Sequence, residues 1–333
     1  MITLVTGATG HIGTNLVRAL CGRKRRVRVL IHCRDWPMAD LDVEPVQGDI
    51  CDRASLERAF RGVGSVFHLA GQISIVREKW AVLEKTNVTG TRNIVQACLD
   101  SGVRRLVHFS SIHALLPTLP DSVVDESCTL AKGPNCPAYD RSKARGEEEV
   151  RRGIEEGLEA VIIIPTAVIG PFDFQPSYLG AALLAMAQGK LPALIRGGFD
   201  WVDVRDVVEG AIQAETLGAP GARYLLSGHR ASVREIADLV AEITGIPAPK
   251  LVFPMWMAQA GAPLVEKITQ LAKKRSLFTS ESVRALRGGH NISHEKATRE
   301  LDYRPRPLRE TIADTLGWFG ESARKGRVEA EPE

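Results

Sequence analysis

A tyrosine and a lysine four residues apart, Tyr139 and Lys143, form the pattern Y-x-x-x-K near the middle of the chain. Because residues four apart lie on one face of a helix, the phenol and the ammonium group can address the same site. The phenol of a free tyrosine titrates near pH ~10, and a cation held close to it favours the phenolate. The pair therefore predicts an acid–base group; an exposed helix that carries one Tyr and one Lys is the alternative.

Two serines, Ser110 and Ser111, stand at the end of the apolar run over 105–110, which predicts a buried strand. In an open α/β sheet, ligands bind beyond the carboxyl ends of the strands. The Ser111 hydroxyl is therefore placed to hydrogen-bond a substrate oxygen.

A glycine-rich segment with the spacing G-x-x-G-x-x-G begins at Gly7 and continues through Gly10 and Gly13. It follows the apolar run 2–5, which predicts a strand, and it precedes apolar residues spaced for a helix face. A strand, a glycine turn and a helix N-terminus together bind a pyrophosphate, because the helix start offers free N–H groups and glycine lets the backbone approach. A turn without a ligand is the alternative.

Alternating strands and helices are expected to position these groups. Strands are predicted at 2–6, 27–31, 43–46, 66–69, 105–110 and 160–164. Helices are predicted at about 12–21, 53–60, 81–100 and 138–156. This alternation predicts the α/β fold class with a doubly wound parallel sheet.

The glycine turn, the serine at a strand end and Y-x-x-x-K, in this order, resemble the extended short-chain dehydrogenase/reductase family, also called the NAD-dependent epimerase/dehydratase superfamily. Within it the chain is most similar to the dihydroflavonol 4-reductase and 3β-hydroxysteroid dehydrogenase branch. The resemblance covers nearly the whole chain. It implies a Rossmann dinucleotide-binding domain from 1–165 and 200–227, a smaller and mostly helical substrate lobe from 166–199 and 228–320, and a frayed tail at 321–333.

The resemblance also assigns roles to four side chains. Ser111 would polarise the oxygen of a carbonyl or alcohol, and Tyr139 would supply or remove its proton. Lys143 would lower the Tyr139 pKa and bind the nicotinamide ribose, and Asn87 would help to hold the site. Together they imply reversible hydride transfer between a nicotinamide and a carbonyl or carbinol carbon.

The same resemblance places a dinucleotide cofactor against a larger set of residues. These are Gly7, Thr9, Gly10, His11, Ile12, Gly13, His32, Arg34, Asp49, Ile50, Leu69, Ala70, Gly71, Tyr139, Lys143, Pro165 and Val168. Members of the family that prefer NAD carry an acid at the end of the second strand, which would repel a 2′-phosphate. No acid stands at 31–33 here, and a guanidinium follows at Arg34. NADP(H) is therefore favoured, and NAD(H) stays open.

The substrate side lacks the polar groups that hold a diphosphate. The sugar-nucleotide epimerases of this family have an Asn where this chain has Ala167, and an Arg where it has Phe199. Burying a diphosphate without partners is costly, so a hydrophobic, cyclic ketone or alcohol is favoured. The sugar dehydratases of the family have an Asp-Glu pair at the position of Ile112 and His113. Candidate substrate contacts are Gln72, His113, Ala167, Phe172, Tyr178 and Phe199.

Two other functions stay open: a sugar epimerase of the same family that uses a transient keto intermediate, and a non-catalytic nucleotide sensor, although such sensors typically lack the Tyr/Lys pair. The net charge of +3, with acids and bases interspersed, argues against a nucleic-acid partner. The six cysteines show no metal-binding spacing with His, and reduced thiols predict a cytoplasmic protein without a metal. A membrane contact through 254–275 is disfavoured, and a homodimer stays open.

Overall fold

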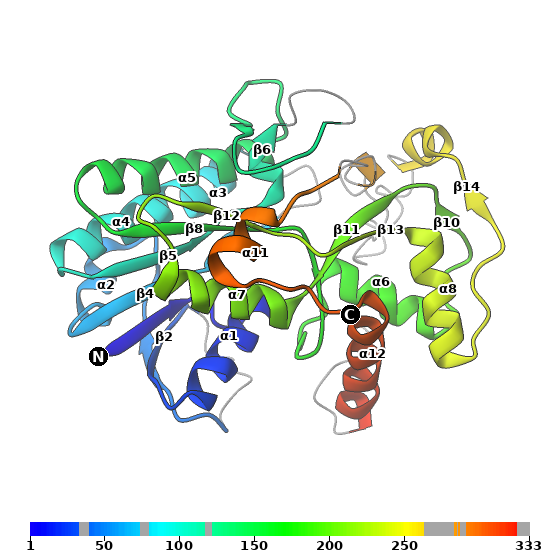
Figure 1. Cartoon of the computed structure of the whole chain (residues 1–333), viewed down its shortest axis with the longest axis horizontal. Coiled ribbons are helices and arrows are strands. Elements are labelled where there is room, and N and C mark those ends of the chain that lie inside the picture. The colour runs from blue at the N-terminus through cyan, green and yellow to red at the C-terminus, as the bar shows by residue number, and fades with distance from the viewer. Residues whose placement is uncertain are drawn as a thin grey trace.

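A seven-stranded sheet forms the centre of the protein (Figure 1). The computed structural model describes residues 1–32, 40–73, 80–116, 122–262, 283–284, 286 and 291–324. The strands lie in the order β12-β8-β5-β4-β1-β2-β3, and every neighbouring pair is parallel. They are β1 (Ile2–Thr6), β2 (Arg26–Ile31), β3 (Glu44–Gln47), β4 (Val63–His68), β5 (Arg105–Phe109), β8 (Ala160–Pro165) and β12 (Arg223–Leu226). The predicted doubly wound parallel sheet is confirmed.

Helices cover both faces of this sheet, which explains why its inner strands are continuous apolar runs. One face carries α1 (His11–Gly22), α7 (Val204–Leu217) and α11 (Glu295–Leu301), whose apolar residues share one core with the sheet. The other face carries α2 (Arg53–Ala59), α4 (Thr91–Asp100) and α5 (Ala138–Glu155), which share a second core. Figure 1 shows α1 and α7 below the sheet and α4 and α5 above it.

The helix predicted over 81–100 is divided into three parts. A short α3 (Trp80–Leu83) leads into a π-helix, η1 (Glu84–Gly90), and α4 follows. A π-helix places one more residue in each turn, and such turns often occur at functional sites. The apolar periodicity of the sequence does not reveal this change in winding.

A second, smaller group of elements follows the central sheet in sequence. A three-stranded sheet in the order β13-β11-β9 consists of β9 (Ala167–Ile169), β11 (Gly198–Asp203) and β13 (His229–Ser232). Around it lie α6 (Tyr178–Ala187), α8 (Val233–Thr244) and α12 (Leu308–Arg324), with an apolar core of their own. Two short pairs complete the sheets: β6 (Leu115–Leu116) with β7 (Thr129–Leu130), and β10 (Leu194–Ile195) with β14 (Val252–Phe253). The predicted domain boundaries at 166, 200 and 228 stay a prediction.

The C-terminal part differs from the sequence prediction in one respect. Helix α12 continues to Arg324 and buries Ser322, whereas a frayed tail is predicted from residue 321; residues 325–333 lie outside the described part of the chain. Of the segment 254–275, the structure describes only the first residues, and there Trp256 is 69% exposed. Within the described ranges, no helix is long and apolar enough to cross a membrane.

Candidate active site

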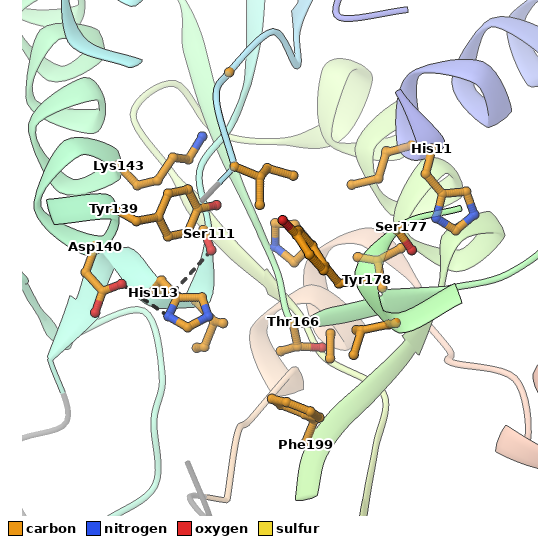
Figure 2. Close-up of a pocket in the computed structure, with 18 of the residues that line it drawn as sticks. His11, Ser111, His113, Tyr139, Asp140, Lys143, Thr166, Ser177, Tyr178 and Phe199 are labelled. Carbon is orange, nitrogen blue, oxygen red and sulfur yellow. Dashed lines mark hydrogen bonds and ion pairs between the residues drawn. The ribbon is translucent and has the colours of Figure 1, made fainter. Parts of the chain in front are cut away.

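A single cavity of about 1350 Å³ brings most of the predicted residues together (Figure 2). It extends from the glycine turn, past the carboxyl ends of β4, β5 and β8, to the smaller group of elements. The predicted residues that line it are Gly7, Thr9, Gly10, His11, Ile12, Gly13, Leu69, Ala70, Gly71, Gln72, Ser111, His113, Tyr139, Lys143, Pro165, Ala167, Val168, Tyr178 and Phe199.

The glycine turn joins β1 to α1 and packs closely against neighbouring backbone atoms. Gly7 has a φ of +68°, and a Cβ there would lie 2.5 Å from the main-chain nitrogen of Ala70. A Cβ at Gly13 would overlap the carbonyl oxygen of Gly7. Gly10 is the N-cap of α1 and has no side-chain capping bond. The atom nearest to a Cβ added there would be the carbonyl oxygen of Gly7, at 3.4 Å. The free helix start and the glycine cradle fit the pyrophosphate of a dinucleotide.

His11 ties this turn to the loop after β9. Its Nε2 donates to the carbonyl oxygens of Gly170, at 3.2 Å, and Pro171, at 3.1 Å. Asn15 Nδ2, one turn further along α1, donates to the same Pro171 oxygen at 3.0 Å. The start of α1 is therefore held directly against the loop after β9.

Ser111 and Tyr139 meet at the inner end of the cavity. Ser111 follows β5 and caps the short helix η2 (Ile112–Ala114), because its Oγ accepts from the main-chain nitrogen of His113 at 3.2 Å. Tyr139 is the second residue of α5. Burial raises the pKa of Tyr139 to about 12, a hydrogen bond with Ser111 lowers it, and the charge of Asp140 raises it. The phenol therefore keeps its proton at neutral pH.

Lys143 lies one turn after Tyr139 on α5. Its Nζ donates to the carbonyl oxygen of Phe109 at 2.7 Å. Burial lowers the pKa of Lys143 to about 8, against the opposing charge of Glu147. Burial of the phenol is the largest cause of the raised Tyr139 pKa, and the lowering by Lys143 stays a prediction.

Asn87 lies in the π-helix and joins three elements without lining the cavity itself. Its Oδ1 accepts from the main-chain nitrogen of Gln72 at 2.7 Å. Its Nδ2 donates to the Gln72 carbonyl oxygen at 3.0 Å and to Ser142 Oγ at 2.9 Å. Asn87 therefore fixes the strand-end segment after β4 relative to α5, which agrees with its predicted supporting position.

Charged groups that the sequence analysis missed lie beneath the cavity. Glu147 is fully buried on α5, accepts from Ser110 Oγ at 3.0 Å and pairs with Arg223 Nε at 2.9 Å. His68, also buried, bonds the hydroxyls of Thr6 at 2.8 Å and Thr91 at 3.1 Å. Burial lowers the pKa of His68 to about 3, so this imidazole is neutral. Only the fold brings these residues together.

Asp140 is a further residue that the sequence analysis did not select. Its Oδ1 lies 3.3 Å from Nδ1 of His113, and both side chains line the cavity (Figure 2). The His113 ring meets the Tyr139 ring edge-on, with 5.7 Å between the ring centroids. The only sequence signal was the position of Asp140 directly after the predicted tyrosine.

The predicted adenosine end lies outside the cavity lining. His32, at the end of β2, has a side chain that is 71% exposed, and its Nδ1 is 4.0 Å from Oδ2 of Asp49. Arg34 lies outside the described residues. The Ile50 side chain is buried in the core, where it would touch any Cβ at Gly90, and its contact with the cofactor stays a prediction.

Most side chains on the substrate side of the cavity are apolar, and the polar Gln175 and the charged Asp173, Asp200 and Arg284 also belong to the lining. The Phe199 ring packs edge-on against Trp201, with 5.3 Å between centroids. Tyr178 enters from the first turn of α6. Apolar lining residues that the sequence analysis missed include Leu116, Ala182, Met186, Leu191, Leu194, Ile195 and Leu286.

The prediction for Phe172 is wrong. Its φ of +61° turns the chain, and its ring packs among other aromatic rings instead of lining the cavity. The centroid of Trp318 lies 5.9 Å away, and the guanidinium of Arg18 lies 4.6 Å above the Phe172 ring. The side chain therefore holds α12 against α1.

We predict that two alanine substitutions in the glycine turn weaken cofactor binding for different reasons. Gly13→Ala should displace the turn and lower both the melting temperature and NADPH affinity. Gly10→Ala fits the protein, so its melting temperature should stay unchanged, while its methyl group at the free helix start should weaken NADPH binding at least ~10-fold, or ~1.4 kcal/mol. Calorimetric titration and thermal unfolding measure both. Normal NADPH binding by Gly10→Ala would contradict the prediction that the pyrophosphate binds at this turn.

Known proteins share this arrangement along almost the whole chain. Residues 3–226 match the NAD dependent epimerase/dehydratase family. Sterol demethylase protein B of Methylococcus capsulatus is 37% identical over 326 residues, which cover 96% of this chain and 99% of that protein. The putative dihydroflavonol 4-reductase of Synechocystis is 30% identical, covering 95% and 93%.

The solved structure of gox2253 superimposes with a TM-score of 0.84 at 32% identity, and the match covers 98% of this chain and 99% of that one. The fold, the glycine turn and the sequence match lead to the same assignment. The chain belongs to the NAD-dependent epimerase/dehydratase family of extended short-chain dehydrogenases/reductases and is an NAD(P)-dependent oxidoreductase of this type.

Proposed function

We propose that this enzyme transfers hydride between NADP(H) and a hydrophobic ring ketone or the corresponding alcohol. The observation that carries the proposal is the joining of Ser111 and Tyr139 in a cavity whose substrate side is mostly apolar. The relatives named for a sterol and a dihydroflavonol support a fused-ring compound. Ala167 and Phe199 offer no charge-assisted hydrogen bonds to a diphosphate.

The proposed mechanism assigns each step to a side chain of this protein. A nicotinamide bound in the cleft would supply hydride to the carbonyl carbon, or accept it from the carbinol carbon. Ser111 donates a hydrogen bond to the substrate oxygen and so polarises the carbonyl. Tyr139 gives its proton to that oxygen as negative charge develops there. Lys143 binds the ribose beside the phenol.

The ionisation of Tyr139 supports ketone reduction near neutral pH. Because burial raises the pKa of Tyr139 to about 12, the acid form of the phenol predominates at neutral pH. Oxidation of an alcohol needs the phenolate as the base, so its rate should rise with pH.

We expect Tyr139→Phe to lower turnover at least ~100-fold, the usual contribution of a general acid. NADPH binding should survive, because the ring remains in place. Lys143→Met should damage both turnover and NADPH binding, since its ammonium group also holds the ribose. Steady-state kinetics and calorimetric titration separate the two effects. Near-normal turnover by Tyr139→Phe would refute the assigned mechanism.

We further propose that NADP(H) is the preferred dinucleotide. The absence of an acid directly after Ile31 and the exposed position of His32 at the end of β2 support this preference. NADPH should bind at least as tightly as NADH, and Arg34→Ala should weaken NADPH selectively. His32→Asp should weaken NADPH but spare NADH, because a carboxylate repels the 2′-phosphate. Titration of each variant with both cofactors measures this, and a clear NADH preference in the wild type would contradict it.

The substrate class is tested by ligand binding and turnover together. With saturating cofactor, a ligand at a hundred times its Kd adds ~2.7 kcal/mol of stability, which a thermal shift detects. We expect shifts and NADPH consumption with 3-ketosteroids, trans-2-decalone or flavanones, and no shift with UDP- or dTDP-sugars. A shift with nucleotide sugars alone would favour the sugar epimerase instead.

A further inference from the structure

The contact between His113 and Asp140 has no part in the hydride transfer proposed above. Oδ1 of Asp140 lies 3.3 Å from Nδ1 of His113, and both side chains line the cavity. The main-chain nitrogen of His113 donates to Ser111 Oγ, and its ring lies edge-on to that of Tyr139. The imidazole is therefore fixed beside the two hydroxyls that hold the substrate oxygen (Figure 2).

The geometry of this pair is that of a general base oriented by a carboxylate. A carboxylate close to Nδ1 favours the tautomer with the proton on Nδ1, which leaves the lone pair of Nε2 available. Among the residues that the structure describes, none pairs with this Nε2. The His113 side chain is 42% exposed at the cavity, so a proton taken up there can exchange with solvent.

We propose that His113, oriented by Asp140, is a second acid–base group that removes and returns a proton at the carbon adjacent to the substrate carbonyl. This inference rests on the proposed function, because it needs a ring ketone held by Ser111 and Tyr139. The position next to a carbonyl carbon is two bonds from the oxygen. The His113 ring contacts Tyr139 and lines the same cavity as Ser111, which places it next to the group that would hold the oxygen.

The proposed step is enolisation and needs no oxidant or reductant. The bond between the adjacent carbon and its hydrogen breaks, and the proton moves to Nε2 of His113. The electron pair forms a carbon–carbon double bond while the carbonyl oxygen accepts the proton of Tyr139. The reverse step returns a proton to carbon from His113 after exchange with solvent. The enzyme would therefore exchange hydrogen at this carbon and interconvert epimers there.

Deuterium exchange with oxidised cofactor isolates this step from hydride transfer. The full-length enzyme is incubated in D2O with NADP⁺ and the ring ketone, trans-2-decalone or a 3-ketosteroid, that it reduces with NADPH. Proton NMR then follows loss of the signals next to the carbonyl. NADP⁺ carries no hydride to transfer, so any loss above the enzyme-free rate reports enolisation alone.

Three variants distinguish the role of the pair from a general loss of structure. His113→Gln should slow the exchange at least ~100-fold, and it should slow the exchange far more than NADPH-dependent reduction, so that the ratio of the two rates falls at least ~10-fold. Asp140→Asn should also slow the exchange, because the carboxylate that fixes the tautomer is lost. His229→Gln, an exposed histidine outside the cavity lining, is the matched control and should exchange like the wild type.

Each outcome decides the proposal. Exchange by wild type that both His113→Gln and Asp140→Asn slow far more than they slow reduction supports it. Ketone reduction without enzyme-dependent exchange, or equal exchange by wild type and His113→Gln, overturns it and leaves the proposed function standing. If no ketone is reduced, the proposed function fails and this inference fails with it. If one of these two variants has lost NADPH binding or its thermal unfolding transition, the other variant alone is compared with the wild type.

Discussion

The close packing of α5 against η1 and against the central sheet is the constraint on which the site depends. Gly146 allows this approach, because a Cβ there would overlap the carbonyl oxygen of Asn87. One residue further, Glu147 is fully buried between Ser110 and Arg223. Removing one partner of a buried ion pair typically costs ~3–5 kcal/mol, so this contact determines where α5 can lie. Tyr139 and Lys143 then stand two turns and one turn before it.

The same packing of α5 explains the pKa shifts of the catalytic groups. A phenol and an ammonium group held at this depth both lose hydration, which raises the pKa of Tyr139 to about 12 and lowers that of Lys143 to about 8. The buried His68 remains neutral and bonds two threonine hydroxyls, so it adds no charge beneath Lys143. A tyrosine that keeps its proton, next to a lysine whose pKa is lowered, suits an enzyme that protonates a substrate oxygen.

The sequence predicted the parts of this site that local patterns encode. The glycine turn, the strand-end Ser111 and the helix with Tyr139 and Lys143 each follow from short spacings, and the parallel sheet follows from the alternation of elements. The pair of Glu147 and Arg223 joins α5 to the edge strand β12, so no local pattern reveals it. Phe172 was misassigned because its positive φ turns the ring toward α12, which the sequence places far away.

The transfer of a labelled hydride tests the central claim most directly. NADPH deuterated at C4 of the nicotinamide is supplied with a ring ketone, and the product alcohol is analysed by mass spectrometry and NMR. The account predicts one deuterium on the carbinol carbon, from one face of the ring, with loss of this product in Tyr139→Phe. An alcohol without deuterium, or consumption of nucleotide sugar without net oxidation of NADPH, would contradict it.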